Sequence, residues 1–200
     1  MNSSPPTRRR QVLRRLAQAA VVSQLPHTLV TSAQAPNLLP TPACGAPATA
    51  TAEQTEGPYF KRSSPLRQSL LDAGLPGERL TLTGRVLDTR CQPIANALLD
   101  FWQADAAGAY DNRAFRLRGH QFSSPAGLYQ LDTVLPGLYP GRTRHIHVKV
   151  QAPGGRVLTT QLYFPDEPGN RGDGIFSPVL VVVMRRDATG ALAGFDFVLG

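Results

Sequence analysis

The stretch LPGLYPGRTRHIHVKV, residues 135–150, joins a turn rich in proline and glycine to a run in which apolar side chains occupy alternate positions. That alternation is the period of a β-strand. On a strand His145 and His147 point to the same face, whereas on a helix they would diverge by roughly 200°. The stretch therefore predicts a strand that presents a two-nitrogen clamp for a metal ion. Tyr139, in the turn before it, is a candidate oxygen ligand.

The rest of the chain repeats this strand character in short segments separated by turn-forming residues. Glycine and proline number 18 each, as expected where many short strands are joined by tight turns. The segments are residues 79–86, 98–103, 115–122, 128–134, 145–151, 157–164 and 179–185, with a last hairpin through 187–190 into 194–199.

No helical pattern of about ten residues or more lies between these segments, which disfavours parallel βαβ units. We therefore predict an all-β fold: a β-sandwich of mainly antiparallel strands with long connecting loops and little helix. The one short helix expected begins at Ser64-Pro65 and ends at Gly74.

The first 35 residues have the features of a targeting segment. Three arginines at 8–10 precede a weakly apolar stretch, and residues 32–35 read Ser-Ala-Gln-Ala, a small-residue cleavage pattern. This order resembles a twin-arginine export signal and predicts a periplasmic or secreted protein. The alternative is a basic tail. Residues 36–56, rich in proline, alanine and threonine, are expected to form an extended arm, and residues 57–200 the β-sandwich domain.

Most of the positive charge belongs to this N-terminal segment. The chain has 21 basic and 14 acidic residues, a formal net charge of +7. Five of the arginines and none of the acids lie in residues 1–35, so the remainder has 16 basic and 14 acidic residues. The charge therefore gives no reason to expect a nucleic-acid partner. No apolar run approaches the ~20 residues of a transmembrane helix, so no stable membrane association is expected.

The chain has two cysteines, Cys44 and Cys91. In an exported protein they could form a disulfide that ties the N-terminal arm to the turn after the first long strand. Two unpaired thiols are the alternative, and the sequence alone leaves both open.

Four motifs together carry a family resemblance. They are WQADAAGAYDN (102–112), FRLRGHQ (115–121), PGLYPGRTRHIHVKV (136–150) and TTQLYFPDE (159–167). In this order they resemble the intradiol ring-cleavage dioxygenases, nearest to the catalytic subunit of protocatechuate 3,4-dioxygenase. The resemblance covers about residues 55–165 and starts at EGPYF, residues 56–60.

The resemblance implies an iron(III) centre held by two tyrosines and two histidines. The matching residues are Tyr110, Tyr139, His145 and His147. This donor set is chemically coherent, because Fe(III) is a hard cation that suits phenolate oxygen with imidazole as its nitrogen partner. The implied activity is O2-dependent cleavage of a catechol between its two hydroxylated carbons, giving a cis,cis-muconate-type diacid.

The resemblance also assigns two pocket residues. Arg142 matches an arginine beside the substrate ring, where a permanently charged guanidinium stabilises developing negative charge. Gln161 matches a glutamine that lines the same pocket, and Tyr139 is the ligand that takes a substrate proton. Arg144 departs from the proline or alanine of many relatives, and its charge either tunes substrate choice or faces solvent.

Other nearby side chains are expected to be structural. Phe101 and Trp102 are assigned to the core, and Arg116 and Arg118 to a solvated strand face, with the alternative that one of the two arginines reaches the mouth of the pocket. His120 is expected either at the surface or in contact with the metal ligands, and not as a ligand itself.

Two alternative interpretations assign the chain to another class of protein or of metal site. LTGRVLDTRCQPIANALLDFW, residues 82–102, resembles the opening strands of transthyretin-like and carboxypeptidase-regulatory modules, which would make the chain an exported, non-catalytic β-sandwich. A copper or zinc site built on His120, His145 and His147 is the second. The sequence leaves the catecholic substrate unnamed and a homo-oligomer open.

Overall fold

The computed structural model describes residues 1, 44 and 48–200. The export signal predicted for 1–35 and much of the arm predicted for 36–56 lie outside the described residues. The described strands are β1 (Arg79–Asp88), β2 (Leu98–Trp102), β3 (Arg118–Phe122), β4 (Leu128–Val134), β5 (His145–Gln151), β6 (Val157–Tyr163), β7 (Val183–Asp187), β8 (Gly190–Gly194) and β9 (Phe197–Leu199). Two 3₁₀ turns, η1 (Pro168–Arg171) and η2 (Pro178–Leu180), lie between β6 and β7.

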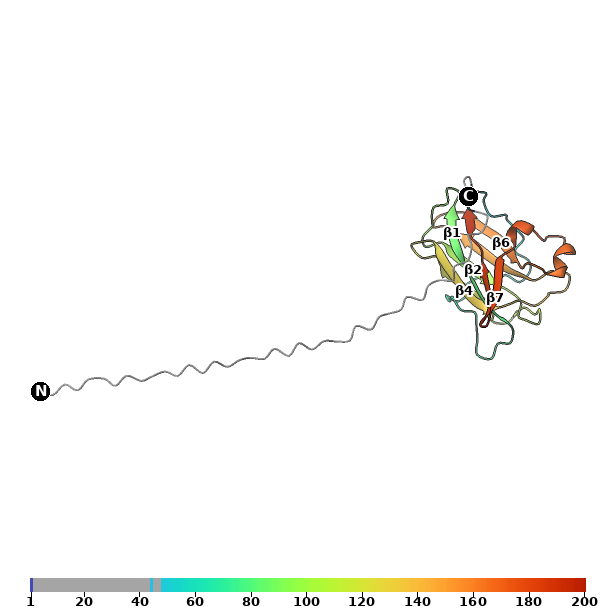
Figure 1. The fold of residues 1–200 in the computed structure, drawn as a ribbon, viewed down its shortest axis with the longest axis horizontal. Helices are drawn as coiled ribbons and strands as arrows, with labels where there is room; N and C mark the ends of the chain where they lie inside the picture. The colour runs from blue at the N-terminus through green and yellow to red at the C-terminus, as the bar shows by residue number, and fades with distance from the viewer. Residues whose placement is uncertain (2–43, 45–47) are drawn as a thin grey trace. The chain divides into compact units, whose positions relative to one another are not determined.

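The strands form two sheets (Figure 1). One has the order β4-β1-β8-β7, with β9 continuing along β1, and the other has the order β3-β2-β5-β6. Five of the seven strand pairs are antiparallel, and only β8 and β9 run parallel to β1. The predicted all-β sandwich of mainly antiparallel strands is confirmed.

The core lies between the sheets and follows the alternation in the sequence. In β5 the apolar side chains Ile146, Val148 and Val150 are buried in the core cluster, together with residues from β1, β4, β6 and β8. His145 and His147 occupy the intervening positions and therefore face away from the core, as the two-residue period requires. Strand β5 begins and ends at the residues predicted for it.

Strand pairing sets residues of the outer face in rows across the four-stranded sheet. Trp102 pairs with Arg118 on one side and with His147 on the other, and His147 pairs with Gln161. These four residues form the row at one end of the sheet, where β2 and β6 end and β5 begins. The functional candidates thus lie at this end, opposite the β5–β6 turn.

Three local predictions are wrong. Residues 64–74 contain no helix; Leu66 and Ser69 instead bridge to His120 and Asp132 in extended conformation. The segment predicted as strand from 115 becomes regular only at Arg118, because its earlier backbone is drawn into a turn. The segment 179–185 starts as η2, with the strand following at 183–187. In each case tertiary hydrogen bonds or proline override local pattern.

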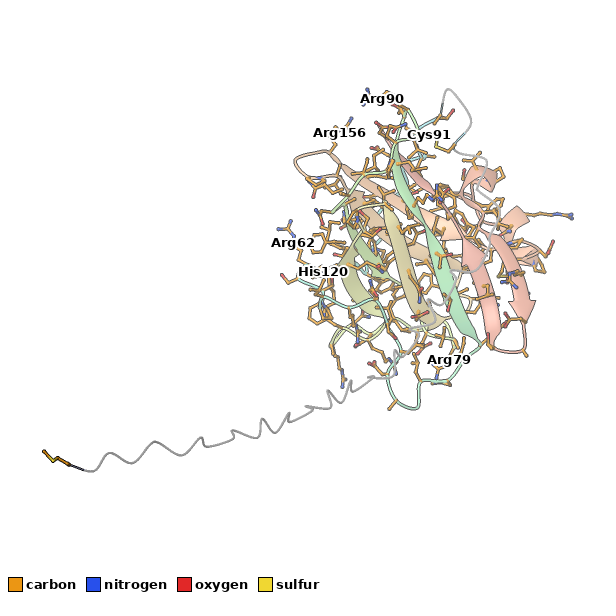
Figure 2. All side chains as sticks on the ribbon, turned by 60° about the vertical axis from the view of Figure 1, so that its left-hand side comes forward. Arg62, Arg79, Arg90, Cys91, His120 and Arg156 are labelled. Atoms are coloured by element: carbon orange, nitrogen blue, oxygen red, sulfur yellow. A yellow bond between two sulfur atoms is a disulfide. The ribbon has the colours of Figure 1, made fainter. Side chains whose placement is uncertain are left out.

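Cys44 and Cys91 form a disulfide, which resolves the alternatives left open by the sequence. Figure 2 shows Cys91 and Arg90 at one end of the β-sandwich and Arg79, at the start of β1, toward the other. The described part of the chain contains no helix that is long and apolar enough to span a membrane.

Candidate metal centre

Two loops bring the predicted tyrosine ligands together. Tyr110 lies in the loop after β2 and Tyr139 in the loop after β4. Gly108 is the point where the loops touch, because a β-carbon at this residue would lie 2.0 Å from the Leu138 carbonyl oxygen. Its φ of +85° is also a conformation that glycine adopts readily. The rings of Tyr110 and Tyr139 meet edge to face, with centroids 5.9 Å apart.

His145 Nε2 lies close to both His147 Nε2 and the Tyr110 hydroxyl oxygen. The Nε2 atoms of His145 and His147 are 3.2 Å apart, and the Tyr110 hydroxyl oxygen lies 3.3 Å from His145 Nε2. Ligand atoms that share one metal ion at about 2.1 Å, roughly at right angles, are about 3 Å from each other. The two distances from His145 Nε2 therefore fit coordination of one ion by neighbouring ligands. Both histidines are nearly sealed from solvent, with exposed fractions of 4% for His145 and 3% for His147.

His145 is held in the tautomer that a metal ligand needs. Its Nδ1 lies 2.7 Å from the carbonyl oxygen of Thr143, which can only accept a hydrogen bond, so Nδ1 carries the proton. The lone pair of the neutral ring is then on Nε2, the atom that faces the cluster. Burial lowers the pKa of His145 to about 4 and holds that of His147 well below its usual range, so both rings are neutral at pH 7.

Tyr110 lies among positive charges. Burial raises its pKa, and the guanidinium groups of Arg142 and Arg118 oppose that shift. A phenol in such a site stays protonated until a cation binds to its oxygen, when the proton can be lost outright. The two hard oxygen donors and two imidazoles thus fit a ferric ion. His147 Nδ1 has no hydrogen-bond partner among the described residues.

A third tyrosine, Tyr59, belongs to the cluster and was not predicted as a site residue. Its ring stacks on Tyr110 with centroids 4.3 Å apart, and its hydroxyl oxygen lies 2.9 Å from that of Tyr139. Tyr59 occurs in EGPYF, the first motif of the resemblance, which was the available signal. Only the tertiary fold brings this segment across the outer face of the sheet.

The predicted pocket residues Arg142 and Gln161 are in direct contact. Arg142 Nη2 donates to Gln161 Oε1 at 2.6 Å and lies 3.4 Å from the Tyr163 hydroxyl. Gln161 is held in turn, because its Nε2 donates to the Thr55 carbonyl at 2.9 Å. All six predicted site residues therefore gather at one end of the sheet. Asp173, which accepts a 2.8 Å hydrogen bond from Arg142 Nε, was missed because no sequence pattern marks it.

Arg118 does not lie on the solvated face that was expected for it; of the two arginines, it is the one that reaches the proposed site. It is 1% exposed, donates from Nη2 to the Tyr59 carbonyl at 2.8 Å, and lies 5.9 Å from the Tyr110 ring centroid. The residues around Tyr59 lie over the outer face of the four-stranded sheet and bury the row to which Arg118 belongs. Arg116 is half-exposed and paired with Asp105, as a surface arginine should be.

Trp102 is buried as expected, but on this outer face, where its ring stacks on His147 at 4.8 Å. His120 lies one row further along the strands, paired with Asp100. Its Nδ1 is 3.1 Å from Ser64 Oγ, and Ser64 Oγ donates to Asp100 at 2.7 Å. His120 is therefore engaged in a separate hydrogen-bond network, which disfavours a histidine-only copper or zinc site.

Comparisons with known proteins agree with this geometry. A protein-family model described as "Dioxygenase" matches residues 55–199. The chain is 36% identical over 118 residues to a protocatechuate 3,4-dioxygenase beta chain from Burkholderia cepacia, covering 50% of each protein. It is 28% identical over 185 residues to a chlorocatechol 1,2-dioxygenase from Rhodococcus opacus, covering 74% of this chain and 72% of that protein.

A solved structure is also similar. It is the dioxygenase domain of a dioxygenase carbohydrate-binding protein fusion from the cellulolytic bacterium Streptomyces sp. SirexAA-E. The two share 55% sequence identity with a TM-score of 0.74, over 76% of this chain and 98% of that one. Against several of the curated relatives, in contrast, the chain spans only about half of their length.

Proposed function

Because this chain belongs to the intradiol ring-cleavage dioxygenase family, we propose that it cleaves a catechol-type ring with O2 between the two hydroxylated carbons. The product is a cis,cis-muconate-type diacid. The proposed ligands of a ferric ion are Tyr110, Tyr139, His145 and His147. The observation that carries the proposal is the close spacing of three donor atoms. His145 Nε2 lies 3.2 Å from His147 Nε2 and 3.3 Å from the Tyr110 hydroxyl oxygen.

Bound ferric iron would supply the chemistry that makes a catecholate reactive toward O2. The protein's own groups bind and orient the substrate. Tyr139 takes one catechol proton, and the Tyr59 hydroxyl, 2.9 Å away, is placed to donate a hydrogen bond to the Tyr139 oxygen. Arg142, with its side chain 19% exposed, offers a permanent positive charge to the negative charge that develops on the ring. Asp173 holds Nε of that guanidinium, and Gln161 holds Nη2.

We infer that the substrate range extends to larger plant-derived catechols. The support is the 55% identical dioxygenase domain from a cellulolytic bacterium, together with two exposed apolar side chains near the centre. Leu138, next to Tyr139, is 56% exposed, and Ile175, whose carbonyl accepts a hydrogen bond from Tyr163, is 40% exposed. Such side chains favour an apolar substituent on the ring.

The test combines colour and oxygen uptake. Phenolate-to-ferric charge transfer should tint the iron-loaded protein red-brown, and an oxygen electrode should record uptake with a panel of simple and substituted catechols. Tyr110→Phe should remove much of the visible band and abolish turnover. A Tyr110→Phe protein with wild-type colour and turnover would refute the ligand set. A colourless, inactive wild-type protein after iron loading would refute the proposed activity.

Export is part of the same proposal. The twin-arginine pattern of the first 35 residues supports it, and so does the Cys44–Cys91 disulfide, since such bonds persist in oxidising compartments. Fractionation of cells that express the whole chain should place the protein outside the cytoplasm. Replacing the three arginines at positions 8–10 with lysine should leave it inside, because twin-arginine export depends on two adjacent arginines.

A further inference from the structure

Residues 142–144 lie between the proposed ligands Tyr139 and His145. The side chain of each one bonds a side chain of residues 167–173, here called the 167–173 loop. The pairs are Arg142–Asp173, Thr143–Asn170 and Arg144–Glu167, with donor–acceptor distances of 2.8, 2.7 and 2.7 Å. The loop packs closely, because a β-carbon at Gly169 would lie 3.1 Å from Thr143 Oγ1. One segment of chain thus clamps the segment that carries Arg142.

Asp173 is the most deeply placed member of this clamp. Its side chain is only 2% exposed. One carboxylate oxygen accepts from both Arg142 Nε at 2.8 Å and the Thr143 backbone N–H at 2.9 Å, and the other accepts from the Ile175 N–H at 3.1 Å. Burial acts to raise the pKa of Asp173, but these hydrogen bonds and the guanidinium bring it below the usual value. The group is therefore an anion at neutral pH.

The guanidinium of Arg142 is fixed at two of its three nitrogens. Asp173 holds Nε, and Gln161 holds Nη2 at 2.6 Å. No described residue accepts a hydrogen bond from Nη1, so its N–H donors remain for a ligand. Without the Nε contact, a long arginine side chain would regain rotamer freedom and lose its fixed direction.

The guanidinium of Arg144, by contrast, is hydrogen-bonded to other parts of the protein. Its Nε donates to Glu167, and its Nη1 donates to the Pro136 carbonyl in the turn that carries Tyr139. The two arginines that flank Thr143 therefore have different tasks. Arg144 ties two loops together, and Arg142 keeps donors free.

We propose that Asp173 is a positioning residue that fixes the direction of the Arg142 guanidinium and so sets how the arginine's charge meets the reacting ring. The inference rests on the proposed function. Asp173 does not touch substrate or iron; it acts through Arg142. Its loss should lower kcat while leaving iron content and the visible charge-transfer band in place, because no proposed ligand is removed.

The experiment is a double-mutant cycle on the full iron-loaded protein, with Asp173→Asn, Arg142→Met and the double variant. Iron content, the visible band, thermal unfolding, kcat and KM are measured for each. Glu53→Gln is the matched control, because it is also an acid-to-amide change. Glu53 pairs with Arg156 at the surface, and Arg156 lies at the β5–β6 turn, at the opposite end of the sheet from the proposed site (Figure 2). The control should behave as the wild type.

Asp173→Asn should lower kcat about ten- to a hundredfold, as expected for a charge-assisted hydrogen bond that orients a catalytic group. The double variant should be no slower than Arg142→Met, because the effect of Asp173 passes through Arg142. Multiplicative losses, or a wild-type kcat in Asp173→Asn, would overturn the inference. A wild-type protein inactive on every catechol would instead refute the proposed function.

Arg142→Lys provides a second route if Asp173→Asn unfolds at a markedly lower temperature. Lysine keeps the charge and leaves the loop intact, but a single ammonium group cannot bond Asp173 and Gln161 in the fixed fork of arginine. Its kcat should fall about as far as expected for Asp173→Asn. A fully active lysine variant would show that the fixed direction is unimportant and would overturn the inference.

Discussion

The hydroxyl oxygens of Tyr59 and Tyr139 lie 2.9 Å apart, although the residues are 80 positions apart in the chain. The hydrogen bond to Tyr139 is the main reason why the pKa of Tyr59 is raised. Tyr59 therefore stays protonated at neutral pH and is the donor once Tyr139 is ionised. A neutral phenol thus supports the oxygen that is proposed to accept the substrate proton.

Tyr59→Phe should keep iron but alter the electronic state of Tyr139. Without the donated hydrogen bond the Tyr139 phenolate becomes a stronger donor, so the charge-transfer band should move to lower energy and turnover should fall about three- to tenfold. Visible spectroscopy and oxygen uptake measure both effects. Tyr129→Phe is the control, since that hydroxyl bonds the Phe195 carbonyl inside the core. An unmoved band in Tyr59→Phe would count against the contact.

Gly108→Ala should separate the two tyrosine loops. The new β-carbon would lie 2.0 Å from the Leu138 carbonyl, so one loop must shift. We expect a loss of about 1–3 kcal/mol in the free energy of unfolding and a clear fall in iron affinity. Gly74→Ala has a similar positive φ, +74° against +85°, but no atom lies within 4 Å of its β-carbon. If both variants bind iron equally well, the close approach is not what positions the tyrosines.

Iron-free protein should lose stability in mild acid. The pKa of His145 is lowered from 6.5 to about 4 by burial, so between these values the unfolded chain binds the proton and the folded chain does not. Stability from this group is complete above pH 6.5 and is lost as the pH falls toward 4. At pH 5 the loss from His145 alone should be roughly 2 kcal/mol. His147 shifts in the same direction and adds to it.

Urea unfolding of the iron-free protein at pH 7 and pH 5 measures this loss. A variant with both histidines replaced by asparagine should show a smaller difference between the two pH values. Equal pH dependence in the two proteins would exclude the histidines as its source.

The disulfide should make a large contribution to stability. Cys44 and Cys91 are 47 residues apart, and closing a loop of this length in the unfolded chain is worth about 4 kcal/mol by the chain-entropy account. The double variant with serine at both positions should unfold at correspondingly lower urea concentration, with an unchanged visible band after iron loading. A wild-type unfolding midpoint would show that the bond does not constrain the unfolded state.

Local sequence determined the strand that carries the histidines. The alternation of residues 145–151 fixes both the strand and the shared face of His145 and His147, since the two-residue period leaves no other arrangement. The family motifs likewise indicated Tyr110, Tyr139, Arg142 and Gln161 before any geometry was known. Where regular structure depended on distant partners, as at residues 64–74, the sequence prediction was wrong.

The tertiary structure alone decided the surroundings of these residues. Arg118 has the alternating pattern of a surface strand, yet the segment around Tyr59 covers it, because burial is set by what packs above a face and not by the strand's own period. The Tyr59–Tyr139 and Arg142–Asp173 contacts span 80 and 31 residues and have no local signal. Sequence thus named the chemical groups, and long-range packing fixed the directions in which they point.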